Sequence, residues 1–220
     1  MNIYWETKYW KQKIPFIIGL DEVGRGPLAG PLVTNGVLIR PFSTLPKKFV
    51  SLVKDSKKLN ARQREYITKM VKELPQIVSS TSVISVETIN KIGIEKSIFM
   101  SFQNNIKKIK SKVKTPVNLL LIDGNKIIPN FQLADQKSII KGDNKIFAIA
   151  LASIIAKDTR DKIMIRYAKQ YQQYQFDVHK GYGTQLHFEL IKKYGPCAIH
   201  RKSFYPISQY FLKDNNVQNN

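Results

Sequence analysis

Two adjacent carboxylates, Asp21 and Glu22, follow an apolar run over residues 14–20, and a glycine-flanked arginine, Arg25, comes directly after them. A continuous apolar run of this length that ends near glycine and proline is typical of a buried strand. Two acids at the end of such a strand are costly unless a cation neutralises them. The flanking glycines let the backbone approach a ligand closely, and the arginine offers a planar fork for a phosphate. The pattern therefore indicates metal-assisted chemistry on a phosphodiester.

Two further acids stand where apolar runs end. Asp123 follows the run over residues 117–122, and Asp143 follows a short run at residues 138–140. Each alone has an ordinary explanation, because an acid after a strand is commonly part of a turn and an acid before a helix is commonly a cap. Active sites of open α/β sheets gather at strand ends, so the three places together predict one cluster of four carboxylates. Such a cluster suits two divalent cations that activate water and stabilise a leaving oxygen.

The elements that must position these acids alternate between strands and helices. The apolar runs predict strands over residues 14–20, 32–39, 77–84, 117–122 and 138–140. Helical spacing predicts helices over residues 61–74, 94–110, 145–174 and 185–194, with caps at Asn60 and Thr184. This alternation favours an α/β sheet covered on both faces. The short connection between the first two strands makes part of the sheet antiparallel, so we expect a mixed sheet.

The composition of the chain limits its binding partners and its cellular setting. The chain has 220 residues and a formal net charge of +20, with 36 basic against 16 acidic residues. This excess favours a polyanionic partner, although the abundance of lysine, asparagine and isoleucine could also reflect the base composition of the genome. Cys197 is the only cysteine, which excludes an internal disulfide and a cysteine zinc cluster. We expect a reducing, cytoplasmic setting and recognise no signal peptide or membrane span.

Eight short blocks stand in an order that is specific as a set. They are GLDEVGRGP from residue 19, DSKKL from 55, LIDGN from 121, IKGD from 140, ASIIAK from 152, RD from 160, HKGYGT from 179 and HRKSF from 200. This ordered set resembles bacterial ribonuclease HII, the type 2 ribonuclease H, from residue 14 to about residue 210.

The resemblance implies a ribonuclease H-like mixed sheet flanked by helices, with a C-terminal helical portion. It implies an endonuclease that cuts the RNA strand of RNA–DNA hybrids and also cuts at single ribonucleotides embedded in duplex DNA. We expect a catalytic core over residues 1–178, a helical portion over 179–213 and a polar tail over 214–220. The expected partners are these nucleic acids, and the protein is expected to be a monomer that binds no membrane.

The family pattern also assigns residues. Asp21, Glu22, Asp123 and Asp143 would be the catalytic residues and would bind Mg²⁺ or Mn²⁺. The residues expected to read the ribonucleotide are Gly24, Arg25, Gly26 and Tyr182, and those expected to contact phosphates are Lys57, Ser153, Lys157 and Arg160. Asp158 departs from the family, which usually has an apolar residue there, and we interpret it as a solvated helix residue. The three histidines, at 179, 187 and 200, are expected to be structural or to face phosphate rather than to carry protons.

Two alternatives remain open at this point. The sister type, ribonuclease HIII, usually carries an added N-terminal domain and lacks the Gly24-Arg25-Gly26 form of the loop, and this chain has a short N-terminus and has that form. A non-catalytic duplex-binding module would use the basic charge alone. The four acids argue against such a module, because carboxylates without a metal repel phosphate.

Overall fold

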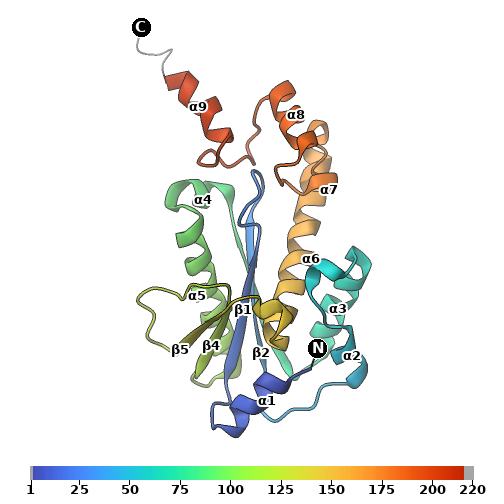
Figure 1. Ribbon diagram of the computed structural model, residues 1–220, viewed down its shortest axis with the longest axis vertical. Coiled ribbons are helices and arrows are strands. Elements are labelled where there is room, and N and C mark those ends of the chain that lie inside the picture. Colours follow the sequence, from blue (N-terminus) through green and yellow to red (C-terminus); the bar gives the residue numbers. More distant parts are fainter. Residues whose placement is uncertain (1, 216–220) are drawn as a thin grey trace. The chain divides into compact units, whose positions relative to one another are not determined.

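A mixed β-sheet forms the centre of the computed structural model, which describes residues 2–215, with 212–215 described in their backbone alone. The sheet has five strands in the order β3-β2-β1-β4-β5 (Figure 1). The strands are β1 (Ile17–Val23), β2 (Leu32–Ile39), β3 (Ile77–Ile84), β4 (Leu119–Asp123) and β5 (Asp135–Ile139). β1 pairs antiparallel with β2 and parallel with β4, and β4 pairs parallel with β5. The expected mixed sheet is confirmed.

The first strand begins and ends later than the sequence predicted. Residues 14–16 are not part of it, because the backbone N–H of Ile14 donates to the carbonyl of Tyr9 and closes the turn after the first helix. At the other end, pairing with β2 continues to Val23 opposite Val33. The strand stops only at Gly24, whose φ of +99° leaves the extended region. Asp21 and Glu22 therefore lie inside β1 rather than after it.

The helices match the expected ones where a cap and an apolar stripe agree. They are α1 (Tyr4–Lys11), α2 (Lys47–Leu52), α3 (Ala61–Glu73), α4 (Val86–Ile92), α5 (Ile94–Val113), α6 (Phe147–Gln170), α7 (Phe176–His179), α8 (Gln185–Tyr194) and α9 (Ile207–Asn215). Three 3₁₀ turns join them: η1 (Ser56–Lys58), η2 (Gly142–Asn144) and η3 (Gln172–Tyr174). Asn60 and Gln63 form the predicted capping box of α3, and the Thr184 hydroxyl accepts the His187 N–H to cap α8. None of the described helices combines the length and apolar character that crossing a bilayer requires.

Several short helices were not predicted, namely α1, α2, α4, α7 and α9. Helix α4 is cut from α5 at Gly93, which has a φ of +79°, and only its Ser85 cap marks its start. The sequence predicts one long helix over residues 145–174. In the structure α6 ends at Gln170, and the 3₁₀ turn η3 follows it. The backbone of α9 continues to Asn215, so the expected polar tail begins within a helix, and residues 216–220 lie outside the described part.

Close packing of α6 on the sheet fixes the position of β1. A Cβ atom at Gly19 would stand 2.6 Å from the carbonyl carbon of Ala148, so only glycine allows the helix to approach this strand. The first half of α6 is buried and includes Ala148, Ala150 and Ala152, small residues that permit the contact. They belong to a large apolar cluster with Phe49, Leu121 and residues from α1 to α3.

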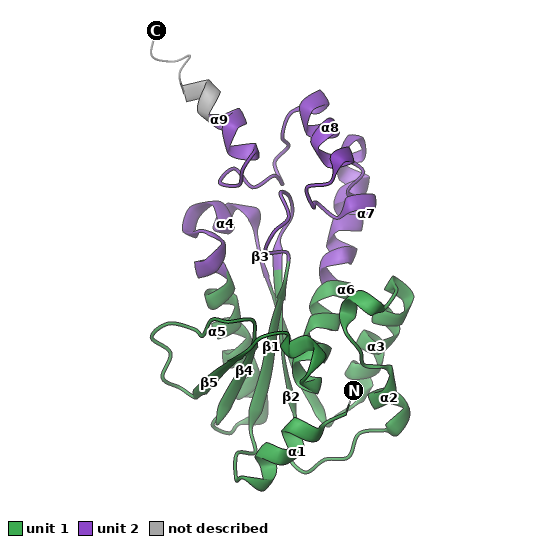
Figure 2. Ribbon diagram, viewed as in Figure 1, with its two compact units in different colours: residues 1–23, 33–82, 98–158 green, residues 24–32, 83–97, 159–220 purple. Residues whose placement is uncertain are grey.

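The chain divides into two compact units (Figure 2). Unit 1 comprises Met1–Val23, Val33–Ser82 and Ile98–Asp158, and it contains most of the sheet. Unit 2 comprises Gly24–Leu32, Val83–Ser97 and Thr159–Asn220, so the loop between β1 and β2 groups with the C-terminal helices. The boundary after residue 178 that the sequence suggested stays a prediction.

Glu6 on α1 is a buried carboxyl that binds the start of α6. It is 2% exposed, and its Oε1 accepts the backbone N–H of Ala148 at 2.8 Å. Its Oε2 is buried without a hydrogen-bond partner. The helix dipole favours an anion at this end of α6, but burial outweighs it and raises the pKa of Glu6 to about 7.

We expect the Glu6→Gln variant to remove a pH dependence of stability. Because the folded-state pKa of about 7 lies above the ordinary value of 4.5, the contribution of Glu6 is complete below pH 4.5 and is lost as pH rises through 7. The shift corresponds to about 3 kcal/mol. Urea unfolding of both proteins at pH 5 and pH 8 measures it: the variant should gain about that much relative to wild type at the higher pH. An unchanged difference between the two proteins would contradict the assignment.

Candidate active site

Asp21 and Asp123 lie at adjacent positions on neighbouring strands of unit 1. β1 and β4 pair in parallel with Leu20 opposite Ile122, so the next residue on each strand is an acid. Asp21 is 5% exposed, whereas Asp123 at the end of β4 is half-buried. Glu22, which is also half-buried, follows Asp21 along β1 and stands opposite Thr34 of β2.

The fourth acid reaches the same place through the turn η2. Asp123 Oδ1 accepts the backbone N–H of Gly142 at 2.6 Å, which brings the neighbouring Asp143 beside it. Lys141 has a left-handed backbone with a φ of +56°, and this turns the chain from β5 into η2. Asp143 is 6% exposed. Three segments that are distant in sequence thus bring four carboxylates to one edge of the sheet.

The carboxylates of Asp21, Asp123 and Asp143 carry negative charge that no basic side chain of the described residues neutralises. Burial raises the pKa of Asp21 well above its usual range, and the neighbouring Glu22 and Asp123 raise it further. Burial also raises the pKa of Asp123, with Asp143 adding to the shift and the Gly142 N–H opposing it. Within residues 2–215, Asp21, Asp123 and Asp143 form no ion pair with a basic side chain. Like charges this close favour a bound cation.

The donor set fits a hard divalent cation such as Mg²⁺ or Mn²⁺, because every candidate ligand is a carboxylate oxygen. In their present orientations the acids do not converge, and no three His, Cys, Asp or Glu side chains of the described residues form a metal-binding group. One oxygen of Asp21 accepts the Glu22 N–H at 2.7 Å, as one of Asp123 accepts that of Gly142. A carboxylate has about four lone-pair sites, so these hydrogen bonds do not exhaust its capacity to bind a cation.

Ser153 supports Asp21 from α6. It is 4% exposed, hydrogen-bonds the Asp21 carboxylate, and has its Oγ 3.0 Å from that of Ser56. This buried position turns Ser153 towards the acid rather than towards a phosphate. Lys57 in η1 is exposed, and Lys157, one turn after Ser153 on α6, is half-buried. Sequence reasoning missed Ser56, although it stands in the DSKKL block.

The Gly24–Leu32 loop of unit 2 presents the arginine that was singled out from the sequence. Arg25 and Gly26 are exposed, whereas Gly24 is buried. A Cβ atom at Gly24 would lie 2.5 Å from Nε of Arg160, so the glycine makes room for a buried arginine. The ring of Tyr182 is 39% exposed and lies over that guanidinium, with 5.6 Å between the ring centroid and Cζ.

Arg160 does not face solvent, as a phosphate ligand would. It is fully buried, and its guanidinium donates to the carbonyls of Ala29, Pro31 and Lys180. The expectation for Asp158 was wrong as well, because this residue is 6% exposed and so is not solvated. Periodicity could not separate the two faces of the first half of α6, since this part of the helix is buried on most sides.

The three histidines form a buried cluster in unit 2. His179 and His187 stack with 4.1 Å between ring centroids, and Nε2 of His187 lies 3.1 Å from Nε2 of His200. One tautomer of each ring satisfies every contact: Nε2–H of His179 donates to the Tyr174 carbonyl, and Nδ1–H of His187 donates to that of Tyr182.

The remaining ring nitrogens act as acceptors. Nδ1 of His179 accepts the N–H of Gly181, and Nδ1 of His200 accepts that of Cys197 at 2.9 Å. The third acceptor, Nε2 of His187, receives the Nε2–H of His200. A proton added to any ring would face another donor. The cluster is therefore neutral and holds the turn around Tyr182, and burial lowers the pKa of His187 to about 3 and of His200 to about 4.

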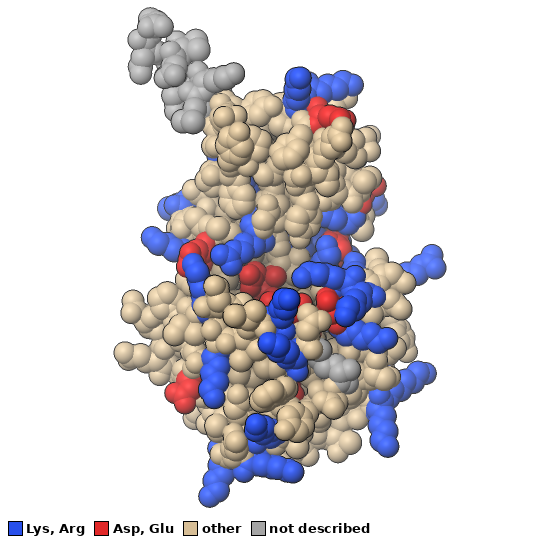
Figure 3. Space-filling view, in the orientation of Figure 1, with Lys and Arg blue, Asp and Glu red and all other residues tan. Residues whose placement is uncertain are grey.

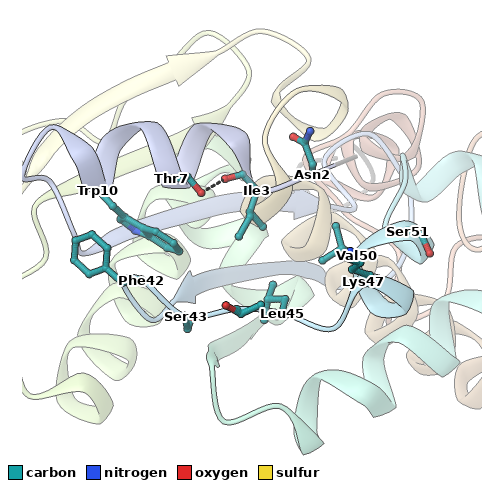
Figure 4. A pocket seen from close by; sticks show the side chains of 11 residues that line it. Asn2, Ile3, Thr7, Trp10, Phe42, Ser43, Leu45, Lys47, Val50 and Ser51 are labelled. Atoms are coloured by element: carbon teal, nitrogen blue, oxygen red, sulfur yellow. Dashed lines mark hydrogen bonds between the residues drawn. The ribbon is translucent and has the colours of Figure 1, made fainter.

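Two further surface features are a pocket and the distribution of charged side chains. A pocket of about 500 Å³ in unit 1 lies between α1 and residues 42–51, with Trp10, Phe42 and Leu45 on its wall, and it is lined by no acid (Figure 4). Lys and Arg side chains are scattered over the drawn face of the molecule, and the fewer Asp and Glu side chains stand at several places, with one group near the middle of the view (Figure 3).

Comparisons with known proteins agree with this arrangement. The family model for Ribonuclease HII matches residues 18–206. The Ribonuclease HII of Endomicrobium trichonymphae is 40% identical over 208 residues, which is 94% of each chain. Two solved structures share the fold: ribonuclease H2 from Pyrococcus horikoshii OT3 (TM-score 0.68, 21% identity, 93% of this chain and 99% of that one) and Bst-RNase HIII in complex with Mn²⁺ (TM-score 0.72, 17% identity, 92% and 71%).

The likeness to these structures places the chain in the class of proteins with the ribonuclease H fold. Within that class the family match decides between the two sister types. The chain belongs to the ribonuclease HII family and is a ribonuclease H, an endonuclease for RNA–DNA hybrids.

We expect the His187→Asn variant to flatten the acid limb of the stability profile. The folded-state pKa of about 3 lies below the ordinary 6.5, so the contribution of His187 to stability is complete above pH 6.5 and is lost progressively as pH falls from 6.5 towards 3. Asparagine keeps a donor for the Tyr182 carbonyl and cannot titrate. Thermal melts from pH 7.5 to 4.5 should show a smaller fall in Tm for the variant than for wild type. Parallel profiles would mean that His187 does not resist protonation.

Proposed function

We propose that this ribonuclease H uses a divalent metal at Asp21, Glu22, Asp123 and Asp143 to cut the RNA strand of hybrids and to cut at single ribonucleotides in duplex DNA. One observation carries the proposal: the parallel register of β1 and β4 makes Asp21 and Asp123 neighbours with no basic partner among the described residues. When bound, Mg²⁺ or Mn²⁺ supplies Lewis-acid chemistry that activates water and stabilises the leaving oxygen.

The residues of the chain hold these carboxylates in place before any substrate arrives. Ser153 and the Glu22 N–H fix Asp21, and the Gly142 N–H fixes Asp123. These hydrogen bonds limit how far each carboxylate must turn to meet a cation. Water attacks phosphorus and the 3′-oxygen leaves, so the products carry 5′-phosphate and 3′-hydroxyl ends. The 2′-hydroxyl stays intact and serves recognition.

Recognition of the ribonucleotide is proposed for Gly24, Arg25, Gly26 and Tyr182. The exposed Arg25 offers a guanidinium for phosphate, and Tyr182 offers an exposed ring that can stack against a sugar. Lys57 and Lys157 are proposed phosphate contacts, because neither is fully buried. The nucleic acids themselves are the proposed partners of a cytoplasmic monomer.

The Asp123→Asn variant should lose cleavage and keep binding. The amide oxygen can still accept the Gly142 N–H, so the turn is preserved while one anionic ligand is lost. Hybrid cleavage with Mg²⁺ should fall to below about a tenth of wild type, a barrier increase above about 1.4 kcal/mol. Gel-shift affinity for the same hybrid without metal should stay within about twofold of wild type.

The matched control for this variant is Asp135→Asn, an exposed acid at the start of β5 in the same sheet. It should cleave like wild type. Retention of more than about a tenth of the turnover by Asp123→Asn would remove Asp123 from the catalytic set.

Tyr182→Ala should reduce cleavage at single ribonucleotides more than cleavage of long hybrids. A ring stacked on the sugar after the ribonucleotide matters most where only one ribonucleotide marks the cut. Both kcat/KM values are measured with Tyr66→Ala, an exposed tyrosine on α3, as the control. Equal losses on both substrates would leave Tyr182 a general or structural role.

A further inference from the structure

Two arginines of unit 2 are buried without a carboxylate partner. Arg160 and Arg201 are both 0% exposed, and neither forms an ion pair with an acid in the described part of the chain. A guanidinium removed from water is costly unless its N–H groups are hydrogen-bonded. The cost is visible in Arg201, where burial, with the nearby Arg160 adding to it, lowers the pKa to about 9. Something in this unit must offset it.

Backbone carbonyls take the place of the missing carboxylates. Arg201 donates to the carbonyls of Gly24 at 2.6 Å, Arg25 at 3.1 Å and Gly30 at 3.0 Å. Arg160 donates to those of Ala29 at 3.0 Å, Pro31 at 3.0 Å and Lys180 at 2.9 Å. Of these acceptors, all but the Lys180 carbonyl belong to the Gly24–Leu32 loop.

Several further backbone groups of the loop are paired with other parts of unit 2. The N–H of Leu28 donates to the Gly181 carbonyl, and the N–H of Gly30 donates to that of Ile199. The Leu28 carbonyl accepts the N–H of Arg201 at 2.8 Å. The guanidinium groups thus bind five carbonyls of the loop, and replacing either arginine would leave buried acceptors unpaired.

Arg160 also touches the turn that carries Tyr182. Its bond to the Lys180 carbonyl lies two residues before the tyrosine, and the tyrosine ring lies over the same guanidinium. Gly24 packs against the other side of this group, where a Cβ atom would stand 2.5 Å from Nε. One side chain therefore contacts both elements that we assign to reading the ribonucleotide.

We propose that Arg160 and Arg201 are positioning residues that hold the Gly24–Leu32 loop and the Tyr182 turn in the arrangement that reads a single ribonucleotide. This inference rests on the proposed function of those two elements. The guanidinium groups act through the backbone and the ring and do not themselves contact the substrate. Because the planar fork makes the carbonyl pattern possible, lysine is not an adequate replacement although it keeps the charge.

The test uses Arg160→Lys and Arg201→Lys in the full chain. For each variant, kcat/KM is measured on a duplex with one embedded ribonucleotide and on a long hybrid. The ratio of the two should fall about tenfold or more, because a small displacement of a positioning group is costly for an oriented substrate. Arg166→Lys is the matched control, since Arg166 is exposed on the same helix, and its ratio should equal that of wild type. An unchanged ratio in both buried variants would overturn the proposal.

A double variant separates this proposal from the one on which it rests. Because part of the effect of Arg160 passes through Tyr182, adding Arg160→Lys to Tyr182→Ala should change the ratio by less than Arg160→Lys does alone. If Tyr182→Ala alone loses equally on both substrates, the proposed reading of the ribonucleotide fails. If Tyr182→Ala behaves as expected while the arginine variants keep the wild-type ratio, only the positioning role fails.

Two further measurements cover the case in which an arginine variant unfolds. Gly24→Ala forces the same contact from the loop side and should lower the ratio about tenfold with the rest of unit 2 intact. In Arg201→Ala, added guanidinium chloride at low millimolar concentration should restore part of the ratio, whereas equal sodium chloride should not. A wild-type ratio in Gly24→Ala together with no rescue in Arg201→Ala would overturn the proposal.

Discussion

The parallel pairing of β1 with β4 is the constraint on which the active site depends. It makes Asp21 and Asp123 neighbours in a buried place, where their repulsion is strong. The pairing holds because Gly19 lets α6 pack directly on β1, so that the apolar contacts of the helix offset the cost of gathering charge. Ser153 comes from the same helix and hydrogen-bonds the Asp21 carboxylate. Packing and charge placement are therefore properties of one helix–strand contact.

In unit 2 two positive side chains are buried, and backbone carbonyl groups compensate their charge. Arg160 and Arg201 are buried there, and carbonyl groups of the Gly24–Leu32 loop accept their hydrogen bonds. The neutral histidine cluster holds the turn around Tyr182 from the other side. A loop that is rich in glycine gains a fixed shape in this way, because its carbonyls are bound by rigid forks rather than by water.

The sequence predicted the parts of the structure that depend on local signals. The strands over residues 32–39 and 77–84, the Asn60 cap and the mixed sheet follow from apolar runs and turn residues, and all are confirmed. The position of β1 relative to Asp21 depended on pairing with β2, which leaves no mark in the local pattern. The family pattern suggested that Arg160 contacts a phosphate, but whether a basic side chain is buried or faces a ligand is decided only by the fold.

The four acids of the site are synthesised at different times during translation. Asp21 and Glu22 leave the ribosome in the first strand, and β2 can pair with that strand as an adjacent hairpin. Asp123 and Asp143 follow only after α3, β3 and α5 have been synthesised. In a hairpin of β1 and β2 alone, the two carboxylates would be exposed to water. Water screens their charges, so they would not repel strongly. The carboxylates repel strongly, and favour a bound cation, only when β1 pairs with β4 as well as with β2.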